Sequence, residues 1–163
     1  MSNGAAGHGR WVIYLSLFIG LALSLWPLPD VVRPFWPAWS ALVLLYWGMA
    51  LPNRVNVGIF WITGILLDVL HGALLGENAL ALAVLAFVIT RWYLQVRVFP
   101  VSQQILAVAL LLALYEFLLF WIRGIAGVSQ PLFYSIAPVV SGALIWPWLY
   151  FVLRGVRRRY RVS

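Results

Sequence analysis

Six long apolar stretches constrain this chain more than any other feature of its sequence. Each has 15 to 23 residues, and short turns rich in proline, glycine, asparagine or arginine separate them. A helix needs roughly 17–25 residues to cross the ~30 Å hydrocarbon core of a bilayer. The sequence therefore predicts an all-α integral membrane protein, a single bundle of six transmembrane helices. The expected spans are 11–26, 35–51, 57–71, 73–92, 101–122 and 131–153, between a short polar tail at 1–10 and a basic tail at 154–163.

Composition supports this class of protein. The chain is 64% hydrophobic and only 9% charged, whereas a soluble domain carries about 25% charged residues. Its net charge of +7 would suggest nucleic acid in a soluble protein, but here we attribute the charge to arginine-rich segments facing the cytoplasm and expect no nucleic acid. The chain has no cysteine and only two histidines, so we expect no metal and no cofactor.

The distribution of arginine predicts the orientation. With six crossings both termini lie on one side, and that side holds nine of the eleven basic residues, while the other holds Arg33 and Arg123. Arginine collects in cytoplasmic segments, so both termini are expected in the cytoplasm. The short third stretch leaves an alternative, in which 57–78 is a re-entrant hairpin. That arrangement would move the arginine-rich tail outside, against the charge rule.

Polar residues within the apolar stretches gather toward the extracytoplasmic side of the predicted bundle. Charged side chains at bilayer depth are costly, so they usually face a bundle interior or a wet cavity. Glycines let backbones approach closely and permit non-helical turns. The sequence therefore predicts an outer pocket or interface formed by Asp68, His71, Gly72, Gly76, Glu77, Asn78 and Glu116.

Purely structural roles are open for the same residues. Asp68, His71 and Glu116 could tie helices together through buried hydrogen bonds, which average less than ~1 kcal/mol in membranes. Asp68 and His71 are three residues apart and could touch, and Glu116 shares a helix face with Arg123. Glu77 is expected to be a solvated residue at a helix start, where the helix dipole favours an acid.

The sequence argues against an enzyme. Asp68 and Glu116 are the only candidate pair of carboxylates for intramembrane hydrolysis, and neither lies in a recognisable hydrolase motif. No serine is placed with His71 in a nucleophile pattern, and no Walker-type phosphate loop is present. We expect no catalytic residues. A membrane hydrolase is nevertheless kept as an alternative function. In a hydrolase, Asp68→Asn and Glu116→Gln would each abolish turnover.

Three further features have candidate roles. The turn Pro52-Asn53-Arg54 is tight and polar, and Pro147 is expected to kink the sixth span between Trp146 and Trp148. The bulky rings beside the kink could dock another helix or simply pack. The basic tail could attract anionic lipid at about 1 kcal/mol per arginine or bind a cytoplasmic partner; its arginines are Arg154, Arg157, Arg158, Arg159 and Arg161.

Several motifs resemble the MreD family of rod shape-determining proteins, from residue 9 to the C-terminus. The two more specific ones are the turn from Leu45-Tyr46-Trp47 to Val57-Gly58 and the pattern Gly64 … Leu67-Asp68 … Gly72 … Leu75-Gly76 … Ala79-Leu80. The opening Gly9-Arg10-Trp11-Val12-Ile13 and the motif Trp146-Pro147-Trp148 before the basic tail also fit. An acid at position 116 is family-like, whereas His71 has no counterpart in the family pattern.

The resemblance implies a small non-catalytic subunit of the bacterial rod complex, or elongasome, in the inner membrane. Its implied direct partner is the single-pass scaffold protein MreC. The MreB filament and the glycosyltransferase–transpeptidase pair that builds lateral peptidoglycan are implied through the complex. Membrane lipids and a second copy of the chain are further candidate partners. The implied fold is similar to the substrate-binding subunits of energy-coupling factor transporters, so a vitamin- or metabolite-binding transporter subunit is the alternative function.

Overall fold

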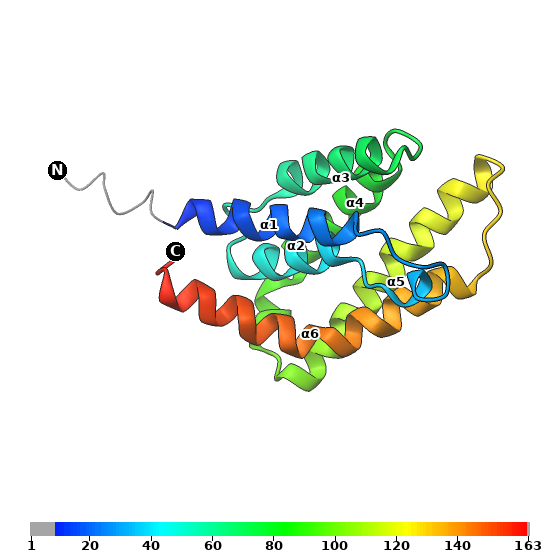
Figure 1. Ribbon diagram of the computed structural model, residues 1–163. Helices are drawn as coiled ribbons and strands as arrows, with labels where there is room; N and C mark the ends of the chain where they lie inside the picture. Colours follow the sequence, from blue (N-terminus) through cyan, green and yellow to red (C-terminus); the bar gives the residue numbers. More distant parts are fainter. Residues whose placement is uncertain (1–8, 163) are drawn as a thin grey trace.

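The computed structural model describes residues 9–162, so the first eight residues of the expected N-terminal tail lie outside the described part. Residues 9–162 form six α-helices and one 3-10 helix, with no strand, which confirms the all-α class (Figure 1). The helices are α1 (Arg10–Ser24), η1 (Arg33–Phe35), α2 (Trp39–Ala50), α3 (Val57–His71), α4 (Glu77–Val98), α5 (Val101–Ile125) and α6 (Phe133–Arg159).

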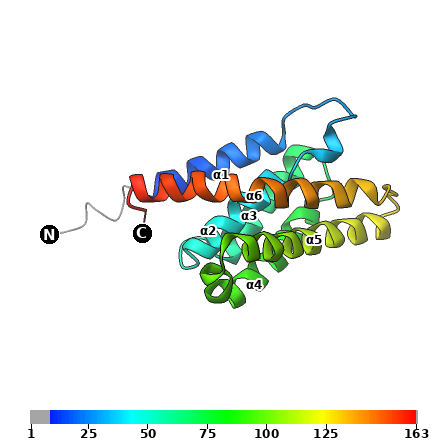
Figure 2. The same ribbon diagram turned by 90° about the horizontal axis from the view of Figure 1, so that it is seen from below.

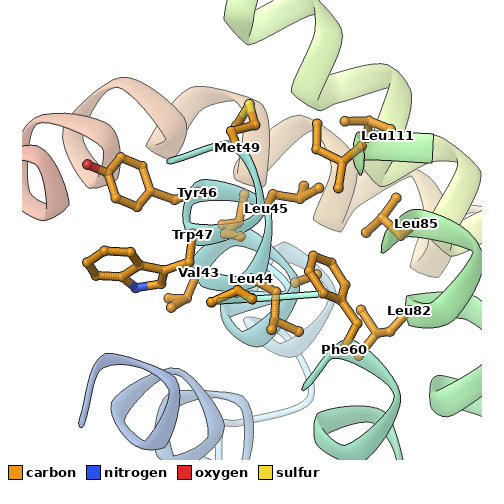
Figure 3. Packing of buried hydrophobic residues seen from close by; sticks show 14 of the residues in the cluster. Val43, Leu44, Leu45, Tyr46, Trp47, Met49, Phe60, Leu82, Leu85 and Leu111 are labelled. Atoms are coloured by element: carbon orange, nitrogen blue, oxygen red, sulfur yellow. The ribbon is translucent and has the colours of Figure 1, made fainter. Parts of the chain in front are cut away.

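Helix α2 forms the centre of the bundle. All its residues, from Trp39 to Ala50, are buried, and it packs against α1, α4 and α6. Figure 3 shows Leu44, Leu45 and Trp47 among side chains from neighbouring helices. A helix that is apolar on every side is typical of a fully enclosed position. It begins four residues after the expected start at 35, because Trp36 and Ala38 flank Pro37 in non-helical conformations and proline disfavours helix in the residue before it.

Helices α3 and α4 form a tightly packed hairpin. Helix α3 has the predicted bounds, because the Asn56 side chain accepts hydrogen bonds from the first turn at its start and Gly72 ends it with a φ of 61°. Helix α4 begins at Glu77 rather than at 73, after a second left-handed glycine, Gly76. A Cβ placed on Gly64 would lie only 2.4 Å from the Ala79 Cα, so glycine is required for this close approach.

The helices differ in their ability to span a bilayer. Within residues 9–162, three helices are long and apolar enough to cross a membrane, namely α4, α5 and α6. Helices α1, α2 and α3 have 15, 12 and 15 residues, so at 1.5 Å per residue they measure about 22, 18 and 22 Å. Helix α6 continues past the expected end at 153, through Pro138 and Pro147 as far as Arg159.

The two ends of the described chain meet. The rings of Trp11 and Tyr160 form an edge-to-face pair with centroids 5.2 Å apart, and buried Val162 packs on Gly9. Figures 1 and 2 both place the start of α1 and the end of α6 at one end of the bundle and the connections 25–38 and 126–132 at the other. The ends of the described chain and these two connections therefore lie at opposite ends of the bundle.

Candidate functional site

A cavity of about 1060 Å³ opens at the end of the bundle away from the chain termini. Its wall is formed by the α1–α2 connection, the α3–α4 turn and the facing ends of α5 and α6. Of the four acidic residues in the chain, three line this cavity. The charged and polar lining residues include Asp30, Arg33, His71, Glu77, Asn78, Tyr115, Glu116, Arg123, Gln130 and Tyr134.

Asp68, the fourth acid, lies behind the cavity wall. It is 1% exposed and accepts hydrogen bonds from the backbone N–H groups of Gly76 at 2.9 Å and Asn78 at 2.8 Å, with a longer one from Ala79 at 3.4 Å. Those groups belong to the start of α4, where the first N–H groups have no partner within the helix. A carboxylate on α3 therefore caps α4, and its charge lies near the positive end of the α4 dipole.

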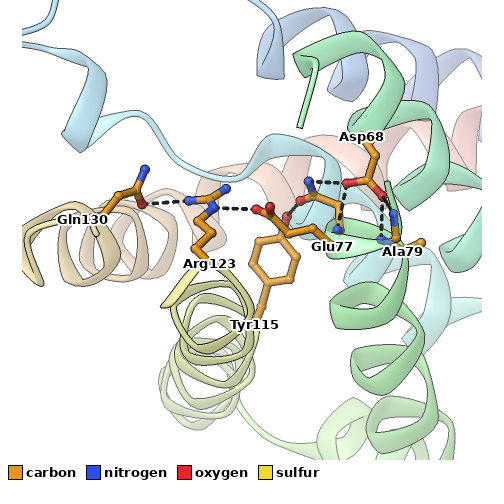
Figure 4. A network of polar contacts seen from close by, with 8 residues as sticks. Asp68, Glu77, Ala79, Tyr115, Arg123 and Gln130 are labelled. Atoms are coloured by element: carbon orange, nitrogen blue, oxygen red, sulfur yellow. Dashed lines mark hydrogen bonds and ion pairs between the residues drawn. The ribbon is translucent and has the colours of Figure 1, made fainter. Parts of the chain in front are cut away.

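Asn78 connects this cap to α5. Its side-chain amide donates to Asp68 at 2.9 Å, and its carbonyl oxygen accepts a hydrogen bond from the Tyr115 hydroxyl at 2.6 Å. Figure 4 shows the resulting chain of polar contacts from α3 through α4 to α5. All three side chains are buried. The network therefore connects three helices to one another in and directly behind the cavity wall.

Glu77 and Arg123 form an ion pair in the cavity wall. The Arg123 Nε donates to a carboxylate oxygen of Glu77, and another nitrogen of the same guanidinium donates to Gln130 at 2.8 Å. The expectation that Glu77 would be solvated is wrong, since the residue is 4% exposed. It does begin α4 as expected, but the end of α5 places Arg123 against it.

Glu116 has no such partner. It lines the cavity and is half-buried, and within residues 9–162 it makes no hydrogen bond or ion pair. Arg123, on the same face of α5, pairs with Glu77 instead. Among residues 9–162, the Glu116 carboxylate is therefore a charge in the cavity lining without a hydrogen-bonding partner.

The remaining predicted pocket residues lie around the α3–α4 turn. His71 and Gly72 line the cavity, and the His71 Nε2 lies 3.3 Å from the Ser24 carbonyl oxygen, which connects the ends of α3 and α1. No hydrogen bond joins His71 to Asp68. Gly76 does not line the cavity but donates its N–H to Asp68.

The other predicted features lie elsewhere. The turn Pro52-Asn53-Arg54 is at the end of the bundle with the termini, where Asn53 and Arg54 line a smaller cavity. Trp146 is fully buried whereas Trp148 is exposed, so the two rings do not form one surface. Of the tail arginines, Arg154, Arg157, Arg158 and Arg159 extend α6, and Arg161 follows it.

Sequence reasoning missed Tyr115, Gln130 and the Asp30–Arg33 segment of the cavity wall. Tyr115 carried a usable signal, because a hydroxyl buried within an apolar helix usually requires a hydrogen-bond partner. Gln130 and Asp30 lie in connections with no motif, and only the folded chain brings them to the cavity.

The arrangement argues against hydrolysis by Asp68 and Glu116. Asp68 lies outside the cavity lining, and N–H groups occupy both its oxygens, whereas Glu116 lines the cavity. The two carboxylates thus do not form the facing pair that shared acid–base chemistry needs. Within residues 9–162 no group of three or more histidine, aspartate or glutamate side chains could hold a metal ion.

Comparisons with known proteins agree over nearly the whole chain. A family model described as rod shape-determining protein MreD matches residues 7–156. A rod shape-determining protein MreD from Haemophilus influenzae is 32% identical over 154 residues, which cover 94% of this chain and 95% of that relative. No solved structure matches the chain.

Proposed function

Because the chain belongs to the MreD family of rod shape-determining proteins, we propose that it is a non-catalytic subunit of the bacterial rod complex, or elongasome. In this role it binds the scaffold protein MreC and supports lateral peptidoglycan synthesis together with MreB and the glycosyltransferase–transpeptidase pair. The observation that carries the proposal is the extent of the family match, which includes the cavity and every helix around it.

The proposed location is the inner membrane, with all six helices crossing it and both termini in the cytoplasm. Nine arginines at the terminal end against two at the other support this orientation. Short α2 is supplemented by η1 and by the non-helical residues 36–38, and non-helical backbone is tolerated at membrane depth where protein encloses it. The large cavity then faces the extracytoplasmic side, and the arginines of 154–161 meet anionic lipid or a cytoplasmic partner.

We assign the large cavity to partner binding. MreC is expected to leave the membrane on the extracytoplasmic side, where the cavity opens under this topology. The Asp68–Asn78–Tyr115 network holds the cavity wall rigid, and preorganisation of this kind lowers the cost of binding. The Glu116 carboxylate is free to receive a donor from the partner.

Gentle detergent extraction of the tagged chain from its host, followed by native mass spectrometry, tests this function. The expected result is a stoichiometric single-pass partner with a large extracytoplasmic domain. Glu116→Leu is expected to weaken that association, whereas Gln103→Leu, an exposed polar residue at the other end of α5, is expected to preserve it. If Glu116→Leu retains the partner as well as Gln103→Leu does, the cavity is not the partner site.

The size of the cavity favours one alternative. At about 1060 Å³ it is as large as the upper range of small-molecule pockets, ~300–1000 Å³, and it presents groups of both charges. A substrate-binding subunit of a vitamin or metabolite transporter would have such a cavity. A bound vitamin-sized molecule or co-purifying ATPase subunits in the same experiment would establish this alternative and overturn the rod-complex role.

A further inference from the structure

A second cavity lies at the opposite end of the bundle, beside the chain termini. Its volume is about 210 Å³, several times the space that one water needs. It forms where the first turn of α1 meets the α2–α3 turn and the start of α3. Arg10 and Tyr14 come from α1, Asn53 and Arg54 from the turn, and Ile59 from α3.

The two arginines in this wall are uncompensated. Within residues 9–162 the only ion pair joins Arg123 to Glu77, and neither Arg10 nor Arg54 makes a side-chain hydrogen bond. All four acids of the chain lie elsewhere, three in the wall of the large cavity and Asp68 beside it. Among residues 9–162, the small cavity is therefore lined by positive charge and by no carboxylate.

The donors of this site suit a phosphate group. A guanidinium presents several N–H donors in a planar fork that matches two phosphate oxygens. The Asn53 amide and the Tyr14 hydroxyl are further donors in the same wall. A cation would meet only positive charge there.

Apolar surface leads away from the cavity and indicates that the phosphate is carried by a lipid. On α1, exposed Phe18 follows Tyr14 by four residues. On α3, exposed Ile62 and Leu66 follow Ile59 by three and seven. These spacings keep each series on one helix face. Free phosphate would make no use of such a surface, whereas acyl chains need one.

We propose that the small cavity binds the phosphate of an anionic phospholipid, with Arg10 and Arg54 as its principal ligands and the acyl chains lying along α1 and α3. Basic pockets between helices on the cytoplasmic side of membrane proteins bind such headgroups. This site is separate from the tail arginines at 154–161, and it does not rest on a role in the rod complex, since no partner protein is needed to form it.

Native mass spectrometry of the full chain in detergent, titrated with phosphatidylglycerol, tests the proposal. The test variant is R10Q/R54Q. Its matched control is R91Q/R97Q, which removes two exposed arginines of α4 that do not line the cavity. Single R10Q guards against misfolding of the double variant, because Arg10 is exposed and its loss breaks no bond. Circular dichroism verifies helix content in all three.

We expect one tightly held phosphatidylglycerol in the wild type and in R91Q/R97Q. R10Q is expected to weaken binding measurably and R10Q/R54Q about tenfold or more, the loss typical of charged hydrogen bonds. Equal binding by the test and control variants would overturn the proposal. A third arm titrates inorganic phosphate: if it binds as tightly as the lipid and with the same dependence on Arg10 and Arg54, the ligand is the free ion and the lipid assignment is wrong.

Discussion

Asp68 on α3 accepts a hydrogen bond from the backbone N–H of Asn78 at 2.8 Å and thereby caps α4, ten residues further along the chain. The cap comes from outside α4 itself, because Gly76, the residue that precedes α4, has no side chain that could serve as one. Capping residues usually immediately precede the helix that they cap. Here the cap belongs to a different helix, so the start of α4 is stable only when the hairpin is packed.

Replacing Asp68 with alanine is expected to destabilise the protein by about 2–4 kcal/mol, because several N–H groups and the Asn78 amide lose their acceptor in a buried place. The measurement is reversible unfolding in mixed micelles. Asp30→Ala, a change of an exposed carboxylate in a loop, serves as the control and is expected to change stability by less than ~0.5 kcal/mol. Similar losses for both variants would contradict the capping role.

Replacing Gly64 with alanine is expected to force α3 and α4 apart. The new Cβ would lie 2.4 Å from the Ala79 Cα and 2.6 Å from its nitrogen, and rigid backbone cannot yield as a flexible side chain can. We expect a loss of about 1–3 kcal/mol, the usual cost of overpacking. Gly155→Ala in α6 meets nothing within 4 Å, so thermal unfolding is expected to show that variant unchanged or slightly stabilised. A neutral Gly64→Ala would disprove the close packing.

Removing Arg123 and removing Glu77 are expected to lower the stability of the protein by different amounts. The Glu77 side chain is 3% exposed and that of Arg123 is 27% exposed, so Arg123→Gln leaves the more buried charge unpaired. Unfolding measurements on Arg123→Gln, Glu77→Gln and the double variant yield the coupling free energy between the two residues. We expect Arg123→Gln to be the more damaging, by about 1 kcal/mol or more, and the double variant to recover part of the loss. Equal, additive losses would argue against the pair.

Tyr115→Phe removes the hydroxyl that donates to the side-chain carbonyl oxygen of Asn78 at 2.6 Å and leaves that oxygen without its donor. Since this oxygen is buried, the expected loss is about 1–3 kcal/mol. Tyr93→Phe is the control, because the Tyr93 hydroxyl makes no hydrogen bond within residues 9–162. The measurement is chemical denaturation of both variants and the wild type. A loss of stability confined to Tyr115→Phe would support the network, and identical denaturation curves for the two variants would contradict it.

Features determined by neighbouring residues were predictable from the sequence. Asn56 and Gly72 are recognisable start and stop signals, and α3 has the expected bounds. The all-α class followed from the apolar stretches, and the family followed from motifs spread over the chain. Helix starts that follow proline or glycine were less accurate, as at α2 and α4, because each such residue admits more than one place for the helix to begin.

Contacts between distant residues were not predictable. Asp68 was a candidate pocket residue, but its partners are mainly backbone N–H groups, which every sequence contains and which only the turn through Gly76 brings together. Burial of Glu77 depends on Arg123, 46 residues away. An isolated helix start predicts a solvated acid, and the bundle overrides that local preference.

The enclosure of α2 also has a consequence for the order in which the protein is assembled. Of the helices that surround α2, only α1 is synthesised before it; α4 and α6 are made later. During synthesis the fully enclosed helix α2 must therefore wait among lipids, or against the translocation machinery, until the last helix arrives. A chain interrupted before Phe133 would leave one flank of α2 uncovered permanently. The ribosome thus makes the innermost helix second, and two of the three helices that enclose it only afterwards.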